Sequence, residues 1–482
     1  MHGMHRRDVL KLAGAAGVAA TGPWWRVGRS QAQRAKKLVF WHLPNFTPLA
    51  DQLQKEQVYE FAAKHAGLKE SEVEYAVVAG EQANAKLAAS IEAGNPPDVI
   101  RLYESNVQFY GAQGHLIDLT DQVNKMRREP KGIFESSMAA VLYKGRALGV
   151  PLAVNPWPVH ARLDLLEQAK VEYPKTWDEF IEVSKKIQSP PRLFAFGMCL
   201  GLVEDTTDNV MNLLWCYGGK MVESDNKTVV MNSAANVAGV KTIEAMFKTH
   251  KIIPQGAISW DNSGNNKAYQ SRQAAFVMNP SSIYAYLDSN DKDLQKKTGL
   301  FPVPAGPKGT VNQIDTWSYG AFKKNPYPDI AKGLIEYFMQ PANYDRIIQS
   351  TGGRWVPVYK RLFDSPFWRE KPEFKHFINM AETGVPVSYA GSPTAAAGEV
   401  LNTHVIPKMI QRVLVDNWEA AKALEECDKR INEIYARPTA RPDGAAVVCA
   451  PRDYSAGARA QALRWRAVNR RGRGRGRHWL RW

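Results

Sequence analysis

Short apolar runs alternate with helical patterns over the first part of the chain after position 36. The runs are Leu38–Trp41, Val73–Val78 and Asp98–Leu102, and the segment before the third has Leu87 and Ile91 on one helical face. Strands that alternate with helices pair in parallel, with the helices covering the sheet. The pattern therefore predicts an α/β fold. It also places the loops after the three runs along one edge, where open α/β sheets bind ligands.

The same alternation begins again after Gly149. Phe194–Met198 and Ala274–Met278 are apolar runs of strand length, and Thr176 with Glu179 three residues later forms a capping box ahead of a helical pattern. Helical periodicity dominates the rest of the chain up to position 435. A chain of 482 residues is long enough for two or three lobes with separate cores.

The net charge of +15 lies almost entirely in the two ends of the chain. Residues 1–32 carry +4 and residues 438–482 carry +9, which leaves +2 for the body. A body without charge bias gives no electrostatic case for a nucleic-acid partner. There is no run of 18 apolar residues, so the sequence predicts no membrane span. Four cysteines are too few for a disulfide framework, and a bridge between Cys199 and Cys216 stays open.

The N-terminus has the three parts of a secretory signal peptide. Arg6-Arg7 opens a basic region, a short apolar run follows, and small residues precede Ala32. The arginine pair resembles a twin-arginine export signal, so we expect residues 1–32 to be removed and the protein to reach the periplasm. The other end, residues 438–482, is an Arg-rich tail of low complexity, which we interpret as a disordered basic extension without a function.

Six motifs then follow in a collinear order. They are Ala93–Val99 (AGNPPDV), Gly114–Thr120 (GHLIDLT), Ala147–Pro151 (ALGVP), Pro174–Phe180 (PKTWDEF), Trp317–Ala321 (WSYGA) and Gly352–Val358 (GGRWVPV). Together they resemble the family 1 extracellular solute-binding proteins of bacterial ABC importers, the maltose-binding-protein-like group. The resemblance covers roughly residues 36–435. The chain departs from the family after the expected hinge, where Val159-His160-Ala161-Arg162 replaces a Tyr-Tyr-Asn segment.

The resemblance implies a two-lobe periplasmic binding protein fold of type II, with a central cleft between lobes joined by hinge strands. We assign 36–147 plus 276–325 to the first lobe and 148–275 plus 326–437 to the second. It also implies a monomer that captures a sugar or oligosaccharide and delivers it to ABC permease subunits in the inner membrane. We expect no enzymatic activity, no cofactor and no metal, since the chain has no GxSxG, HExxH or P-loop and its histidines lack metal-ligand spacing.

Tryptophans in loops and at strand ends are candidates for sugar stacking. A flat aromatic ring can cover the apolar face of a sugar ring, and amides, carboxylates and guanidinium groups can take the hydroxyls. The aromatic candidates are Trp41, Trp157, Trp260, Trp317, Tyr319 and Trp355. Each of these tryptophans is as well explained by core packing. Trp177, Trp368 and Trp418 lie in helical patterns, and we expect them in the core.

Polar candidates lie beside these aromatic residues. They are Glu81, Glu104, Asn155, Asp261, Asn279 and Arg354. Arg354 is the best single candidate, because a guanidinium donates in a fork that suits vicinal hydroxyls. Two alternatives stay open. The same fold could bind a polyamine or another small polar solute through Glu81, Glu104 and Asp261, and a secreted carbohydrate-active enzyme would need a pair of carboxyl groups such as Glu204-Asp205 with Asp261.

Overall fold

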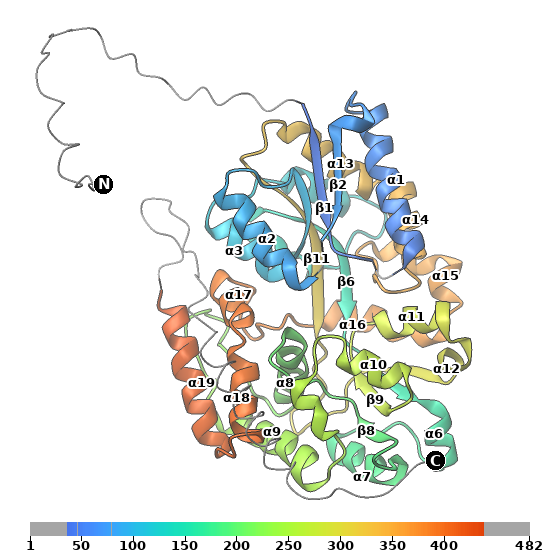
Figure 1. Cartoon of the computed structure of the whole chain (residues 1–482), viewed down its shortest axis with the longest axis vertical. Helices are drawn as coiled ribbons and strands as arrows, with labels where there is room; N and C mark the ends of the chain where they lie inside the picture. The colour runs from blue at the N-terminus through green and yellow to red at the C-terminus, as the bar shows by residue number, and fades with distance from the viewer. Residues whose placement is uncertain (1–35, 46, 79, 438–482) are drawn as a thin grey trace, which may run out of the picture.

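The protein consists of two α/β lobes stacked along its long axis, as the computed structural model shows (Figure 1). The structure describes residues 36–45, 47–78 and 80–437, without the side chains of 80–82. Two main sheets form the frame of the lobes, one of five strands and one of four. None of the helices in these described ranges is long and apolar enough to cross a bilayer.

The first lobe, residues 36–156 and 314–383, is built on the sheet β2-β1-β3-β11-β6. Its strands are β1 (Leu38–His42), β2 (Val73–Val77), β3 (Val99–Tyr103), β6 (Val150–Pro156) and β11 (Ile314–Ala321), with a small hairpin of β4 (Leu142–Tyr143) and β5 (Arg146–Ala147). Its helices are α1 (Pro48–Lys64), α2 (Gly80–Glu92), α3 (Glu104–Ala112), α4 (Thr120–Arg127), α5 (Met138–Val141), α13 (Pro328–Met339), α14 (Pro341–Ser350), α15 (Pro366–Arg369) and α16 (Phe377–Thr383).

The second lobe, residues 159–312 and 385–437, is built on the sheet β10-β7-β9-β8. Its strands are β7 (Val159–Arg162), β8 (Phe194–Phe196), β9 (Ala274–Met278) and β10 (Thr298–Phe301). Its helices are α6 (Leu163–Gln168), α7 (Trp177–Ile187), α8 (Glu204–Cys216), α9 (Ala234–Glu244), α10 (Gly264–Gln270), α11 (Ser282–Asn290), α12 (Lys292–Lys296), α17 (Ala395–Asn402), α18 (Val405–Leu414) and α19 (Ala420–Tyr435).

Local sequence explains the central elements of both lobes. All five residues of β1 are buried, because the strand pairs in parallel with β2 on one side and β3 on the other. In the second lobe the Thr176 N-cap is confirmed, because the Glu179 backbone N–H donates to Thr176 Oγ1 at 3.2 Å, but the return bond of the predicted capping box goes to Lys175 instead of Thr176. The Glu179 carboxylate in turn accepts from the Lys175 backbone N–H at 2.7 Å. Trp177 and Phe180 then face the core from the first turns of α7.

The predicted division into lobes is wrong at three places. β6 belongs to the first sheet, β9 and β10 belong to the second sheet, and α13 to α16 pack on the core of the first lobe. The sequence pattern identified the Ala274–Met278 run as a strand but held no information on its partners. Those partners are β8 in parallel and β7 in the antiparallel direction, and both lie in the second lobe.

Three chain segments cross between the lobes and are hydrogen-bonded to one another. The Trp157 backbone N–H donates to the Gln313 carbonyl at 3.0 Å, and the Ile314 N–H donates to the Val385 carbonyl at 3.0 Å. At Gly384 a Cβ atom would lie 2.4 Å from Ile314 Cγ2, so the third segment fits beside the second only because it has no side chain there. The hinge therefore consists of three adjacent chain segments rather than one linker.

Candidate functional site

Polar and aromatic side chains from both lobes meet next to the hinge. The first lobe contributes residues from the carboxyl end of β3, from β11 and from the loop after α14, and the second contributes residues from the start of α8 and the end of β9. The carboxyl ends of parallel strands and the N-termini of helices are the usual places for ligand groups in α/β folds. We call this set of residues the interlobe group: Tyr103, Glu104, Asn155, Trp157, Asp205, Asp208, Asn279, Asp315, Trp317, Arg354 and Trp355.

Four carboxyl groups influence one another in the interlobe group. Burial, and after it the Asp315 carboxylate, raises the pKa of Glu104 to about 8. Burial also raises the pKa of Asp205 to about 7, that of Asp315 to about 6 and that of Asp208 well above its usual range. Glu104 therefore holds its proton at neutral pH. A protonated carboxyl group can donate a hydrogen bond as well as accept one.

Arg354 supplies the positive charge of the interlobe group. Its side chain is buried, and burial lowers its pKa while the carboxylates of Asp315 and Asp205 oppose that shift. Asp315 lies on β11 of the first lobe and Asp205 on α8 of the second, so the guanidinium faces acidic groups of both lobes. It also lies 4.3 Å from the ring centroid of Trp355, within the range of a cation–π contact.

Three aromatic rings form a connected cluster on the first-lobe side. The Trp317 ring packs edge-on against Tyr103 at 5.3 Å and against Trp355 at 5.5 Å between centroids. Trp355 is buried, and its indole N–H donates to Asn45 Oδ1 at 3.0 Å. Trp317 is only partly buried, and its indole nitrogen has no hydrogen-bond partner among the described residues. The exposed part of Trp317 is therefore the ring itself, because its indole nitrogen is buried.

Amide side chains extend the interlobe group into the second lobe. Asn265 Nδ2 donates to Asn279 Oδ1 at 3.1 Å and to Asp205 Oδ2 at 3.3 Å. Asn279 in turn donates to Ser282 Oγ at 2.9 Å. Nearer the hinge, Asn155 Oδ1 accepts from the Val356 backbone N–H at 3.3 Å. Amides and carboxyl groups that hold one another in this way form a preorganised set of donors and acceptors.

Several predicted site residues lie outside the interlobe group. Trp41 packs in a core between β1 and α2, where the Lys86 ammonium lies 4.3 Å from its ring centroid. Tyr319 is a core residue of the first lobe and donates to Gln54 Oε1 at 2.9 Å. The side chain of Glu81 lies outside the described residues.

Trp260 and Asp261 serve local structure, although the next residue, Asn262, contacts the interlobe group: its Oδ1 accepts from the Asp205 backbone N–H at 3.3 Å. Trp260 packs over Gly264, where a Cβ atom would lie 2.5 Å from the Trp260 side chain. Asp261 is exposed and accepts from the backbone N–H of Ser263 at 2.9 Å and from Lys267 Nζ at 3.3 Å. This is the behaviour of a turn-forming aspartate ahead of a helix. His160, where the chain departs from the family pattern, is fully buried in β7 against Tyr269.

Sequence reasoning missed Arg101, Tyr103, Asp208 and Asp315, and it considered Asp205 only for an enzyme. Arg101 interrupts an apolar strand run, and a charged residue inside such a run signals a buried polar role, whereas Asp315 stands between Ile314 and Thr316 without such a run. Asp208 and Tyr103 carry no comparable signal. The described cysteines, Cys199, Cys216 and Cys427, are free buried thiols, so Cys199 and Cys216 form no bridge. No group of three or more metal-ligating side chains occurs in the ranges that the structure describes.

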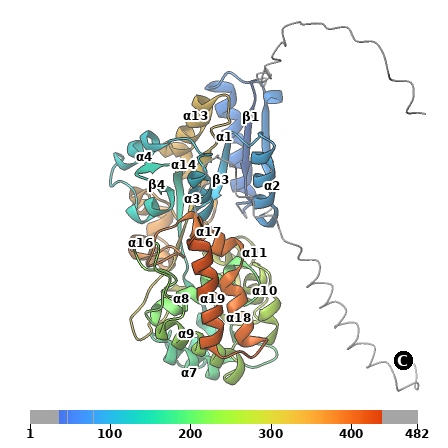
Figure 2. The ribbon, with the colours of Figure 1, turned by 90° about the vertical axis from the view of Figure 1, so that its left-hand side faces the viewer.

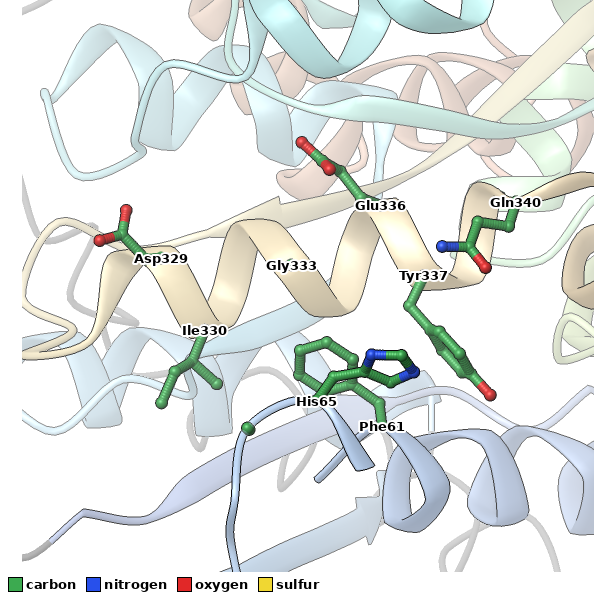
Figure 3. Close-up of a pocket in the computed structure, with 9 residues that line it drawn as sticks. Phe61, His65, Asp329, Ile330, Gly333, Glu336, Tyr337 and Gln340 are labelled. Atoms are coloured by element: carbon green, nitrogen blue, oxygen red, sulfur yellow. The ribbon is translucent and has the colours of Figure 1, made fainter. Parts of the chain in front are cut away.

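A cavity of about 370 Å³ lies elsewhere, between α1 and α13 of the first lobe (Figure 3). The His65 ring lies between Phe61, at 5.8 Å, and Tyr337, at 5.2 Å between centroids. Asp329 and Glu336 line the same cavity but extend away from these rings (Figure 3). Glu336 is already bound to Lys125 and Gln122. This cavity shares no residue with the interlobe group.

Comparison with known proteins gives both the family and the fold. A model of the bacterial extracellular solute-binding protein family matches residues 56–376, which is more than half of the chain. The maltodextrin-binding protein MdxE of Bacillus subtilis is 28% identical over 267 residues, which are 52% of this chain and 58% of MdxE. An uncharacterised lipoprotein of Streptomyces antibioticus is 25% identical over 65% of this chain and 68% of its own. The chain thus spans little more than half of MdxE.

Solved structures agree with this assignment. The maltose-bound MalE3 of T. maritima superposes with a TM-score of 0.72 at 21% identity, over 82% of this chain and 99% of its own. A sugar transporter protein of Arthrobacter chlorophenolicus A6 with bound laminaribiose gives a TM-score of 0.71 at 17% identity, over 82% of this chain and 99% of its own. Likeness at this level of identity shows the two-lobe binding-protein fold. With the family match over residues 56–376, it follows that the chain belongs to the bacterial extracellular solute-binding proteins.

Proposed function

We propose that this protein is the periplasmic solute-binding component of a bacterial ABC importer. In this proposal it binds a sugar or oligosaccharide between its lobes, leaves it chemically unchanged and delivers it to the permease. The observation that carries the proposal is the interlobe group, in which Arg354 faces carboxyl groups of both lobes beside Trp317. Relatives and neighbours support the choice of solute, because their names include maltodextrin, maltose and laminaribiose.

The chemistry of the interlobe group suits a neutral solute rich in hydroxyls. Trp317 offers a partly exposed indole for the apolar face of a sugar ring. Arg354 donates in a fork, and the protonated carboxyl of Glu104 can both donate and accept. The carboxylate of Asp315 and the amide of Asn155 add acceptors and donors at the hinge. Each hydroxyl of a bound sugar would thus find a partner without a net charge being buried.

The hinge explains how the two lobes would close around a solute. The three crossing segments join at the level of Trp157, Gln313 and Val385, so rotation of one lobe against the other requires backbone changes only there. Groups on α8 and β9 would move with the second lobe, and groups on β3 and β11 with the first. Solute bound to both sets would stabilise the closed form and present both lobe surfaces together to the permease.

A cationic solute such as a polyamine is the second candidate. It is favoured by the four acidic side chains of the interlobe group, Glu104, Asp205, Asp208 and Asp315, of which Asp315 and Asp205 act on Arg354. A bound ammonium would draw these carboxyl groups into their ionised forms and would bind more tightly as the pH rises. A neutral sugar would show no such steep dependence.

A thermal-shift screen separates the candidates. The signal-free protein is scanned with maltose, maltotetraose, laminaribiose, tagatose, ribitol and spermidine, because a ligand at 100 times its Kd adds about 2.7 kcal/mol to the free energy of unfolding. We expect at least one carbohydrate to raise the melting temperature, to lose its effect with Arg354→Ala and to be recovered intact. A shift with spermidine alone supports the second candidate. Release of reducing ends in proportion to the protein would contradict the absence of turnover.

A further inference from the structure

Arg101 is a buried cation without an ion-pair partner. It lies in the middle of β3, its side chain is 1% exposed, and it takes part in none of the ion pairs among the described residues. Burying a guanidinium without a carboxylate is unfavourable, and such a group is retained where its hydrogen bonds fix something. The question is therefore what Arg101 holds in place.

Its first contacts are with the segment that follows β1. Arg101 Nη1 donates to Asn45 Oδ1, and Nη2 donates to the backbone carbonyls of Leu43 and Pro44, the latter at 3.2 Å. All three acceptors lie within three consecutive residues, so the planar fork fixes the path of the chain there. This segment continues β1 at the carboxyl edge of the first sheet.

Its second contacts are with the indoles of the interlobe group. The guanidinium carbon lies 4.8 Å from the ring centroid of Trp355 and 5.6 Å from that of Trp317. Asn45 Oδ1, which accepts from Arg101, also accepts from the Trp355 indole N–H at 3.0 Å. One guanidinium therefore connects residues 43–45 to both rings.

We propose that Arg101 is a positioning residue of the solute site, which holds Trp317 and Trp355 and residues 43–45 in the geometry that binds solute. The inference rests on the proposed function, because it assumes that solute meets Trp317. Arg101 itself need not touch the solute, since both its Nη1 and its Nη2 donate to residues 43–45 and its Nε is buried without a partner among the described residues. A lysine keeps the charge but cannot span these acceptors or stack on both rings, so it is not a conservative replacement.

The test compares Arg101→Lys and Arg101→Met with a matched control. Tyr319 lies opposite Arg101 in the β3–β11 register, and Tyr319→Phe removes a buried hydrogen bond to Gln54 in the core of the same sheet. Binding is measured by calorimetry with the carbohydrates of the screen, and amide hydrogen exchange is followed in peptides that contain residues 43–45. Asn45→Ala serves as a second route, because it breaks the shared acceptor without touching β3.

We expect Arg101→Lys, Arg101→Met and Asn45→Ala each to weaken carbohydrate binding at least tenfold and to speed exchange at residues 43–45. Tyr319→Phe should lower the melting temperature and change neither quantity. Unchanged affinity and unchanged exchange in folded Arg101→Lys would overturn the inference. If neither Arg101 variant folds, the same two measurements on Asn45→Ala test the inference instead. If no carbohydrate binds the wild type, the proposed function fails, while the exchange measurement still tests the role of Arg101.

Discussion

Gly398 on α17 approaches Ser105 on α3 so closely that a Cβ atom at position 398 would lie 3.2 Å from both the Cβ and the carbonyl oxygen of Ser105. α3 belongs to the first lobe and α17 to the second, and the two helices lie next to each other in both views (Figures 1 and 2). A methyl group would require Ser105 to move by a few tenths of an ångström, so this contact between lobes leaves no room for a large side chain. It belongs to the same arrangement that brings Arg354 and Asp205 together.

Substitution at this contact should disfavour that arrangement. In Gly398→Leu the new side chain cannot fit against the Ser105 backbone, so the lobes should sit differently and carbohydrate binding should weaken by about tenfold or more, since 1.4 kcal/mol corresponds to a factor of ten. Small-angle scattering should show a changed radius of gyration. Ser90→Leu is the control, because Ser90 lies on α2 of the first lobe and its hydroxyl donates to the Leu87 carbonyl of the same helix at 2.7 Å. Unchanged scattering and affinity in Gly398→Leu would show that the contact does not govern the lobe arrangement.

The buried carboxyl groups predict a decline in stability as the pH rises towards 8. A group whose pKa is raised in the folded state binds more protons folded than unfolded, so the free energy of unfolding falls as the pH rises towards the folded pKa. For Glu104, with a folded pKa of about 8, the fall extends from about 4.5 to 8. His42 and His160, with pKa values lowered to about 3, act oppositely but only below about 6.5.

The melting temperature should therefore fall between pH 6.5 and 8. Glu104→Gln should flatten this decline, by on the order of 1 kcal/mol in the free energy of unfolding, because one proton corresponds to about 1.4 kcal/mol per pH unit. Asp225, which is exposed and whose pKa is lowered by hydrogen bonds from Thr228, provides the matched control Asp225→Asn. An identical slope in wild type and Glu104→Gln would show that Glu104 does not titrate in this range.

Substitution of a tryptophan in the interlobe group should lower the affinity for carbohydrate, whereas substitution of a tryptophan in the core should lower only the stability. Trp317→Ala should weaken carbohydrate binding about tenfold, because an aromatic ring packed on a partner contributes roughly 0.5–1.5 kcal/mol beyond its buried area. Arg354→Ala should weaken it more, since its acidic neighbours stay buried without the guanidinium. Calorimetry measures both variants.

Trp368→Phe is the control for this series. Trp368 is buried in the core of the first lobe, and the aromatic rings that it contacts there are Phe363, Phe367 and Phe374. It should lower the melting temperature and leave affinity unchanged. If Trp368→Phe alone altered affinity, the interlobe group would not be the binding site.

Export stays a prediction from the sequence, because residues 1–32 lie outside the described ranges. Changing Arg6-Arg7 to Lys-Lys should hold the protein in the cytoplasm, since the twin-arginine route reads the pair. Fractionation of cells into periplasm and cytoplasm measures this, and an unrelated Sec-exported protein is the control. Normal delivery of the variant would indicate the Sec route or no signal at all.

The sequence predicts the local elements of this fold well and their assembly poorly. The Thr176 cap, the β1 run and the β9 run follow from side-chain pattern alone, because capping and burial are local properties. Which sheet accepts β9 depends on partners far along the chain. Trp418 shows the same limit, since it lies between α18 and α19 beneath the cations of Arg412 and Lys422 rather than on a helix in the core.

The residues of the candidate site were likewise predicted only in part. Residue type and neighbouring glycine or proline singled out Arg354, Trp317 and Trp355, which do lie together. The same criteria also selected Trp41 and Tyr319, which lie in cores. The sequence around an aromatic residue at a strand end does not indicate whether its side chain faces the core or the ligand. Asp205 joins them only through the meeting of two lobes, and no pattern along one helix encodes that.

The position of β11 has a consequence for how the chain is made. β11 lies between β3 and β6 in the first sheet, yet β6 ends at Pro156 and β11 begins only at Ile314. While the ribosome synthesises the intervening second lobe, the edges of β3 and β6 that will bind β11 have no partner strand. Exposed strand edges can pair with other chains and cause aggregation. Synthesis of the first lobe thus starts before that of the second lobe, but its sheet can be completed only after β11 has been made. An export route that moves folded chains, as the Arg6-Arg7 pair predicts, would retain the protein in the cytoplasm until that gap has closed.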